Sequence, residues 1–108
     1  MAGSGDLLRV LLPAEAVPAR GRVLVLEVYT DGLLVRVVIP SHDDFPYPPW
    51  EAETFALHDD SGTAYRFEGF TAGGQPTHGI VTFSPAAPSD TRWIEAITPA
   101  GRARFNLV

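Results

Sequence analysis

Short runs of alternating apolar and polar residues, separated by glycine and proline, make up most of this chain. The apolar runs are rich in β-branched and aromatic residues, and no stretch of ten or more residues has helical periodicity. We therefore expect eight short strands, at 7–12, 22–30, 33–40, 53–58, 64–69, 79–84, 91–98 and 102–108. In a chain of 108 residues this pattern predicts an all-β fold, an antiparallel β-sandwich of seven to eight strands. We assign 7–108 to a single domain and 1–6 to a flexible N-terminus.

The dipeptide Asp31-Gly32 lies between two apolar runs, as in a two-residue hairpin with a type I′ turn. Counting outward from this turn predicts a register and assigns a face to each residue. The face that we expect in the core carries the pairs Val28 with Val35, Leu26 with Val37 and Leu24 with Ile39.

The opposite face of this hairpin is unusually apolar for a solvated surface. The same count pairs Tyr29 with Leu34, Glu27 with Arg36 and Val25 with Val38. The opposite charges of Glu27 and Arg36 support the register. Because apolar residues surround this one ion pair, we expect another part of the chain, a second copy or a partner to cover the face.

Alternation predicts the rest of the core. Over 91–98 either face is apolar enough to be buried, and we favour Ile94 and Ala96 inside. We read 53–58 and 64–69 as a longer hairpin with Gly62 in a left-handed conformation. The other residues expected to face inward are Phe55, Leu57, Tyr65, Phe67, Val81, Phe83, Ala103, Phe105 and Leu107.

The second half of the chain resembles a known family. The residues that carry the resemblance are Phe55-x-Leu57-x-Asp59-x-x-Gly62-x-x-Tyr65, then Gly79-x-Val81-x-Phe83-x-Pro85 and a closing hairpin at 91–108. This pattern is similar to the telokin-like, immunoglobulin-like domains of uncharacterised bacterial proteins, and it implies an immunoglobulin-like sandwich without catalytic residues. Such domains are often exported or lipid-anchored. This sequence shows no signal peptide and no cysteine for lipidation, so we expect a cytoplasmic protein.

Composition narrows the classes of function. The chain has no cysteine, which excludes disulfides, thiolate metal ligands and a cysteine nucleophile. All eight basic residues are arginines, so lysine chemistry is excluded as well. The net charge of −5 and the scattered arginines argue against nucleic acid and anionic membranes as partners.

Two His-Asp-Asp sequences, at 42–44 and 58–60, are the candidate metal ligands. The residues concerned are His42, Asp44, His58 and Asp60, and a metal-dependent hydrolase or isomerase stays open as an alternative. Neighbouring residues on a strand point to opposite faces, and aspartate is common in turns because it binds backbone amides. We therefore favour a turn role and expect no metal or other cofactor.

The segment Phe45-Pro46-Tyr47-Pro48-Pro49-Trp50 alternates aromatic residues with proline. Packing over one end of the sandwich is the interpretation that we favour. The alternative is that Tyr47 and Trp50 are displayed, so that they, with Phe70 or Trp93, form a small-molecule or carbohydrate-binding module.

No pattern in the sequence indicates a catalytic residue. His78 has no Gly-x-Ser-x-Gly sequence to accompany it, and the glutamates at 51, 53, 68 and 95 have no apolar setting that would shift their pKa values. The sequence therefore favours a non-catalytic β-sandwich that acts through protein contacts, by self-association or by docking to a larger partner.

Overall fold

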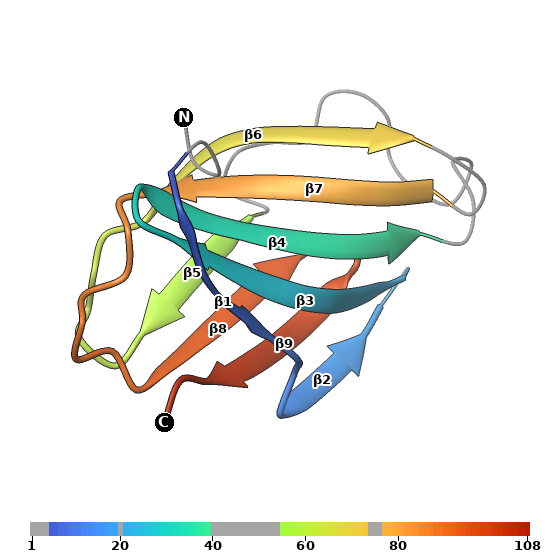
Figure 1. The fold of residues 1–108 in the computed structure, drawn as a ribbon. Helices are drawn as coiled ribbons and strands as arrows, with labels where there is room; N and C mark the ends of the chain where they lie inside the picture. The colour runs from blue at the N-terminus through green and yellow to red at the C-terminus, as the bar shows by residue number, and fades with distance from the viewer. Residues whose placement is uncertain (1–4, 20, 40–54, 74–76) are drawn as a thin grey trace.

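The computed structural model describes residues 5–19, 21–39, 55–73 and 77–108. Within these ranges the chain forms nine strands and no helix, in two antiparallel sheets that pack as the layers of a sandwich (Figure 1). This confirms the predicted all-β antiparallel sandwich. The larger sheet consists, in spatial order, of β1 (Leu7–Leu11), β3 (Arg22–Tyr29), β4 (Gly32–Ile39), β7 (Thr77–Ser84) and β6 (Arg66–Gly73). The smaller sheet consists of β2 (Glu15–Pro18), β9 (Gly101–Asn106), β8 (Trp93–Thr98) and β5 (Ala56–Asp59).

Eight of these strands correspond to the predicted ones, and β2 was not expected. All four residues of β2 are exposed, so no apolar alternation marks the strand in the sequence. Its backbone pairs with β9 at the edge of the smaller sheet. Residues 5–19 therefore supply an edge strand to each sheet.

Side chains from both sheets fill the space between the layers. Ile94 and Ala96 face inward and are fully buried, which confirms the choice made for 91–98. Aromatic rings join the two layers, since Phe55 stacks on Phe67 with ring centroids 4.8 Å apart and Phe67 meets the Phe83 ring edge-on. The largest fully buried side chains among the described residues are Phe83, Phe105, Leu26, Leu33, Ile94, Val35, Val37 and Val81.

The turn between β3 and β4 differs from the predicted one. Thr30 and Asp31 form it, so Val28 pairs with Leu33, two positions away from the expected partner. No non-glycine residue described has positive φ and neither does Gly32, so the type I′ prediction is wrong. The N-terminal segment accounts for the shift, because Asp6 and Thr30 exchange two hydrogen bonds that hold Thr30 in the turn. A slip of two residues keeps the side chains from Val25 to Tyr29 on their predicted faces.

A bulge between Val23 and Val25 changes which residue enters the core. Leu24 was expected to face inward opposite Ile39, but Val23, which pairs with Val37, is buried instead and Leu24 is only half-buried. A bulge adds one residue to a strand and so reverses the alternation beyond it. The side chain of Ile39 lies outside the described residues.

Residues 59–63 connect the two sheets and do not close a hairpin. β5 pairs with β8 in the smaller sheet, whereas β6 pairs with β7 in the larger one, so the predicted hairpin is wrong. The predicted left-handed conformation of Gly62 is confirmed, since its φ is 75°. The buried carboxylate of Asp59 accepts hydrogen bonds from the amides of Ser61 and Thr63 and from the Tyr65 hydroxyl. Alternation had identified the buried faces correctly without identifying the partner strand.

We expect Gly101→Ala to destabilise the fold more than Gly62→Ala. Both glycines have positive φ, which costs another residue about 1–2 kcal/mol. At Gly101 a Cβ atom would also lie 2.7 Å from the carbonyl oxygen of Val17 in β2, whereas at Gly62 it would meet nothing within 4 Å. In urea unfolding, Gly101→Ala should lower the free energy of unfolding by about 1–3 kcal/mol more than Gly62→Ala does. Equal losses in the two variants would contradict the close packing of β2 on β9.

Candidate functional site

The outer face of the larger sheet contains the surface predicted from the sequence. On β3 and β4 it carries the predicted residues Val25, Glu27, Tyr29, Leu34, Arg36 and Val38, as the strand register shows. β1 extends this face, with Leu7 opposite Tyr29 and Val10 opposite Glu27. Three neighbouring strands thus contribute side chains to one surface.

Glu27 is at the centre of a hydrogen-bonded cluster on this face. The Tyr29 hydroxyl donates to one carboxylate oxygen at 2.5 Å, and Arg36 Nε donates to the other in an ion pair. Glu27 was expected directly opposite Arg36, but it pairs with Leu34, and Arg36 reaches it diagonally. The predicted ion pair therefore forms in spite of the shifted register, because diagonal neighbours are within reach of long side chains.

The hydrogen bonds of this cluster favour an ionised Glu27 and a protonated Tyr29. Burial alone would raise the pKa of Glu27, but the hydrogen bonds from Arg36 and Tyr29 and the charge of Arg36 outweigh burial, so this pKa lies below its ordinary value. The pKa of Tyr29 is raised, first by its hydrogen bond to Glu27 and then by burial. Both shifts move the groups away from neutral pH, which fits a structural cluster better than proton transfer.

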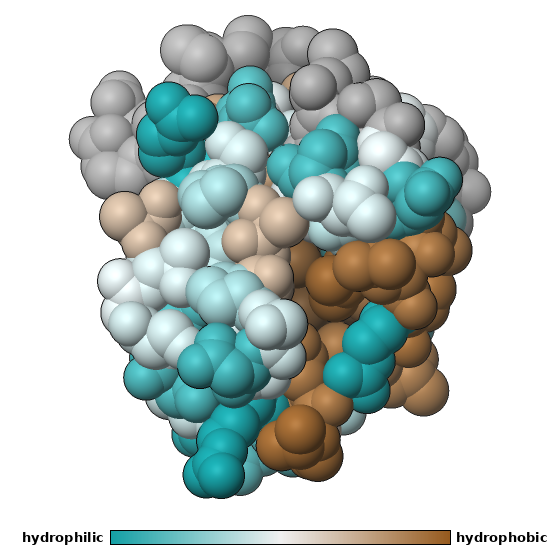
Figure 2. All heavy atoms as spheres, turned by 60° about the vertical axis from the view of Figure 1, so that its left-hand side comes forward, coloured by the Kyte–Doolittle hydropathy of each residue, from teal (hydrophilic) through white to brown (hydrophobic). Residues whose placement is uncertain are grey.

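The apolar part of the hairpin face is mostly covered within the chain. Leu34 is only 8% exposed, and Val25, Tyr29 and Val38 are half-buried. Four exposed apolar residues lie on and beside β1, where Figure 2 shows a broad hydrophobic area, and Val17 and Val108 are exposed elsewhere. We call the group of four the β1 surface: Leu7 (52% exposed), Leu8 (59%), Val10 (56%) and Leu12 (74%).

Sequence reasoning missed the β1 surface because it treated 7–12 as an ordinary strand. The available signal was the density of leucine and valine in that run, which leaves apolar residues on both sides of a strand. Among the described strands, β3 is the one that pairs with β1. The charged residue of β1, Arg9, donates a hydrogen bond to the carbonyl oxygen of Leu107 at 2.5 Å, which ties β1 to the end of the smaller sheet.

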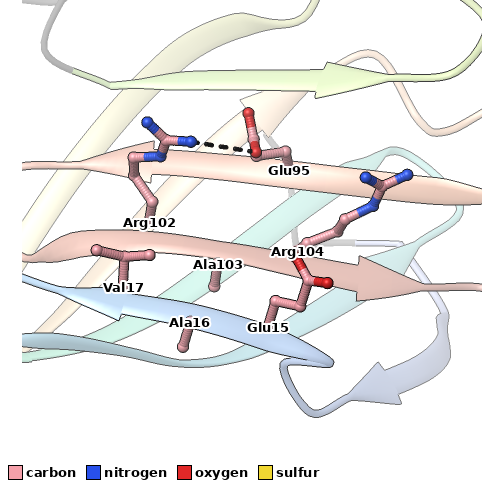
Figure 3. A pocket seen from close by; sticks show the side chains of 7 residues that line it. All are labelled: Glu15, Ala16, Val17, Glu95, Arg102, Ala103 and Arg104. Carbon is pink, nitrogen blue, oxygen red and sulfur yellow. Dashed lines mark ion pairs between the residues drawn. The ribbon is translucent and has the colours of Figure 1, made fainter.

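The outer face of the smaller sheet is polar and has a shallow hollow, shown in Figure 3. Arg102 pairs with Glu95 at 3.7 Å, and the Arg104 guanidinium lies over the Trp93 ring, 4.2 Å from its centroid. Acidic and basic side chains thus balance one another across this hollow. The residues that line it are Glu15, Ala16, Val17, Glu95, Arg102, Ala103 and Arg104.

Of the aromatic residues of the carbohydrate-binding alternative, the two that the structure describes, Phe70 and Trp93, belong to different sheets. Arg104 occupies one face of the Trp93 ring, on the smaller sheet. Phe70 belongs to the larger sheet and is half-buried, with its ring tilted against Phe55. Tyr47 and Trp50 lie outside the described residues.

The candidate metal ligands have other roles where the structure describes them. Asp60 accepts a hydrogen bond from the Arg92 amide at 2.9 Å, and His58 is exposed on β5 opposite Glu95. His42 and Asp44 lie outside the described residues. Across the parts of the chain that the structure describes, no group of three His, Asp or Glu side chains is arranged to hold a metal ion.

A membrane-crossing helix, long and apolar enough to span a bilayer, does not occur among the described residues. In comparisons with known proteins, no family model, curated protein or solved structure matches this chain.

We expect Glu27→Gln to lower stability at pH 7 by about 1–3 kcal/mol, because hydrogen bonds to a charged acceptor are lost. The folded-state pKa of Glu27 is lowered, so its ionised form stabilises the fold above the unfolded pKa of about 4.3. That contribution disappears as the pH falls through the folded pKa. Urea unfolding of both proteins should therefore give a difference in unfolding free energy that is largest near pH 7 and that narrows as the pH falls below the unfolded pKa and through the lowered folded one.

Glu68→Gln is the matched control, because Glu68 is an exposed residue of β6. It should leave the unfolding free energy within about 0.5 kcal/mol of wild type. A gap for Glu27→Gln that stays constant with pH would show that the ionised carboxylate does not stabilise the fold.

Proposed function

We propose that this chain is a non-catalytic β-sandwich that acts through protein contacts, and that the β1 surface makes them. The observation that carries the proposal is four neighbouring apolar side chains, each more than half exposed, at an edge of the larger sheet. Contiguous apolar patches on soluble domains mark interaction sites more often than isolated exposed residues do.

The energy available from this surface is sufficient for binding. Fully burying a leucine or valine side chain contributes roughly 1.5–3 kcal/mol, so covering four that are more than half exposed contributes several kcal/mol. Backbone hydrogen bonds along the edge of β1 that no described strand occupies would fix the register and orientation of a partner strand. The net charge of −5 supports a protein as the partner over nucleic acid or an anionic membrane, and we place these contacts in the cytoplasm.

The buried carboxylates support a non-catalytic role. Glu27 and Asp59 each accept several hydrogen bonds, and both have pKa values below the ordinary range because those bonds outweigh the effect of burial. Carboxylates held ionised by saturated hydrogen bonds stabilise turns and sheet faces. The immunoglobulin-like relationship stays a prediction, and it agrees with a role in recognition.

Substitution at β1 tests the proposal better than substitution at Leu34. Leu34 is buried, so Leu34→Glu would unfold the protein and say nothing about binding. Val10→Lys changes an exposed residue of β1. Val17→Lys is the matched control, because Val17 is 62% exposed on β2, an edge strand of the smaller sheet.

We expect Val10→Lys to abolish protein contacts that wild type and Val17→Lys both make. The three proteins would be used as bait in extracts of cells that express the chain, and each purified protein would be examined by sedimentation velocity. Loss of a captured protein or of self-association only in Val10→Lys supports the proposal. Equal behaviour of all three proteins in both measurements contradicts it.

A further inference from the structure

We infer that the protein docked at the β1 surface is a second copy of this chain, joined by antiparallel pairing of the two β1 strands. The inference rests on the proposed function and makes it specific. Pairing in this way joins two five-stranded sheets into one continuous sheet across a two-fold axis. Val10 lies on that axis.

The first argument is the contrast between β1 and the other sheet edges. The two sheets have four edge strands, β1, β6, β2 and β5. Natural proteins protect such strands from pairing with charged side chains, proline, bulges or short length. β2 carries Glu15 and Pro18 within four residues, and β5 is equally short and carries His58 and Asp59.

The fourth edge strand is protected in the same way. β6 carries Arg66 and Glu68 and has a bulge between Phe67 and Gly69. β1 also has a bulge, between Leu7 and Arg9, but from Arg9 to Leu11 its pairing with β3 is regular. The only charge in β1 is on Arg9, which is engaged with the Leu107 carbonyl. β1 is therefore the described edge that is least protected against pairing.

The second argument is that three of the four residues of the β1 surface are placed symmetrically in sequence about Val10. Leu8, Val10 and Leu12 alternate along the chain and all are exposed. Antiparallel pairing about Val10 places Leu8 of each copy opposite Leu12 of the other, so the same residues meet in both directions. An isologous interface requires this self-complementarity, whereas a contact with an unrelated protein does not.

The charge of Arg9 favours pairing about Val10 over pairing about Arg9, the adjacent residue. Pairing about Arg9 would place two guanidinium groups directly opposite each other, which destabilises a strand pair. Pairing about Val10 places Arg9 opposite Leu11 of the other copy. Because only one strand and its apolar side chains meet, we expect a modest interface with a dissociation constant of roughly 1–100 μM.

A cysteine placed on the two-fold axis tests both the partner and the register. The chain has no cysteine, so Val10→Cys introduces a single thiol. Directly opposite residues in an antiparallel pair have Cβ atoms about 4.5–5.5 Å apart, close enough for a disulfide after a small adjustment. We expect mild oxidation of Val10→Cys to give a covalent dimer in high yield on non-reducing gels.

Two controls define the result. Val17→Cys presents an equally exposed thiol on β2 and should cross-link at least about tenfold more slowly, by random collision. Leu8→Cys alone should not cross-link, but a mixture of Leu8→Cys and Leu12→Cys should do so. Similar rates for Val10→Cys and Val17→Cys would overturn the inference.

Sedimentation of wild type separates failure of this inference from failure of the proposed function. Wild type should associate with rising concentration, and Val10→Lys, which places two like charges at the axis, should weaken association by more than about tenfold. A wild type that stays monomeric at 500 μM overturns the second copy as partner. The proposed function then stands if wild type, but not Val10→Lys, captures another protein, and fails if neither does.

Discussion

A two-layer sandwich can pack only one face of each strand against the other layer, and the structure of this chain follows from that constraint. The inner faces are filled by leucine, valine, isoleucine and phenylalanine from both sheets, and the most central of these are fully buried. Apolar area removed from water there offsets the loss of chain entropy on folding. The side chains on each outer face must then make their contacts with one another, with solvent or with another molecule.

The two outer faces do so in different ways. On the smaller sheet, charged residues of neighbouring strands lie beside one another, as in the pair of Arg102 with Glu95, and Arg104 covers part of Trp93. On the larger sheet, Glu27 is nearly buried but keeps its charge, because Tyr29 and Arg36 donate to both of its oxygens. A buried carboxylate without such donors would cost several kcal/mol. Across β3 and β4, therefore, an apolar face is held together around one satisfied ion pair.

Sequence patterns predicted the faces better than the partners. Alternation placed Ile94, Ala96 and Phe105 correctly in the core, because burial on one face leaves a period of two that any sheet must keep. Pairing depends on contacts distant in sequence, which alternation does not encode. The turn at Thr30 depends on Asp6, 24 residues earlier, and β5 pairs with β8, not with the next strand along the chain.

The candidate site was predicted in part for the same reason. The residues of the hairpin face were correct as a set, since the shift of register by two kept their parity. The exposed fraction of each residue could not be predicted from the sequence, because it depends on which strand becomes an edge of the sheet. Leu34 belongs to a central strand and is buried, whereas Val10 belongs to an edge strand and is exposed.

The position of β1 explains why its apolar residues are better understood as a contact surface than as part of the core. Leu11 packs against the core, and Arg9 fastens the strand to the Leu107 carbonyl. These two contacts and the pairing with β3 hold β1 in place while the side chains of Leu8, Val10 and Leu12 stay more than half exposed. Exposed apolar residues on a sheet edge favour aggregation, so polar residues would serve a solitary domain better at these positions. The proposed partner would cover them and so account for their presence.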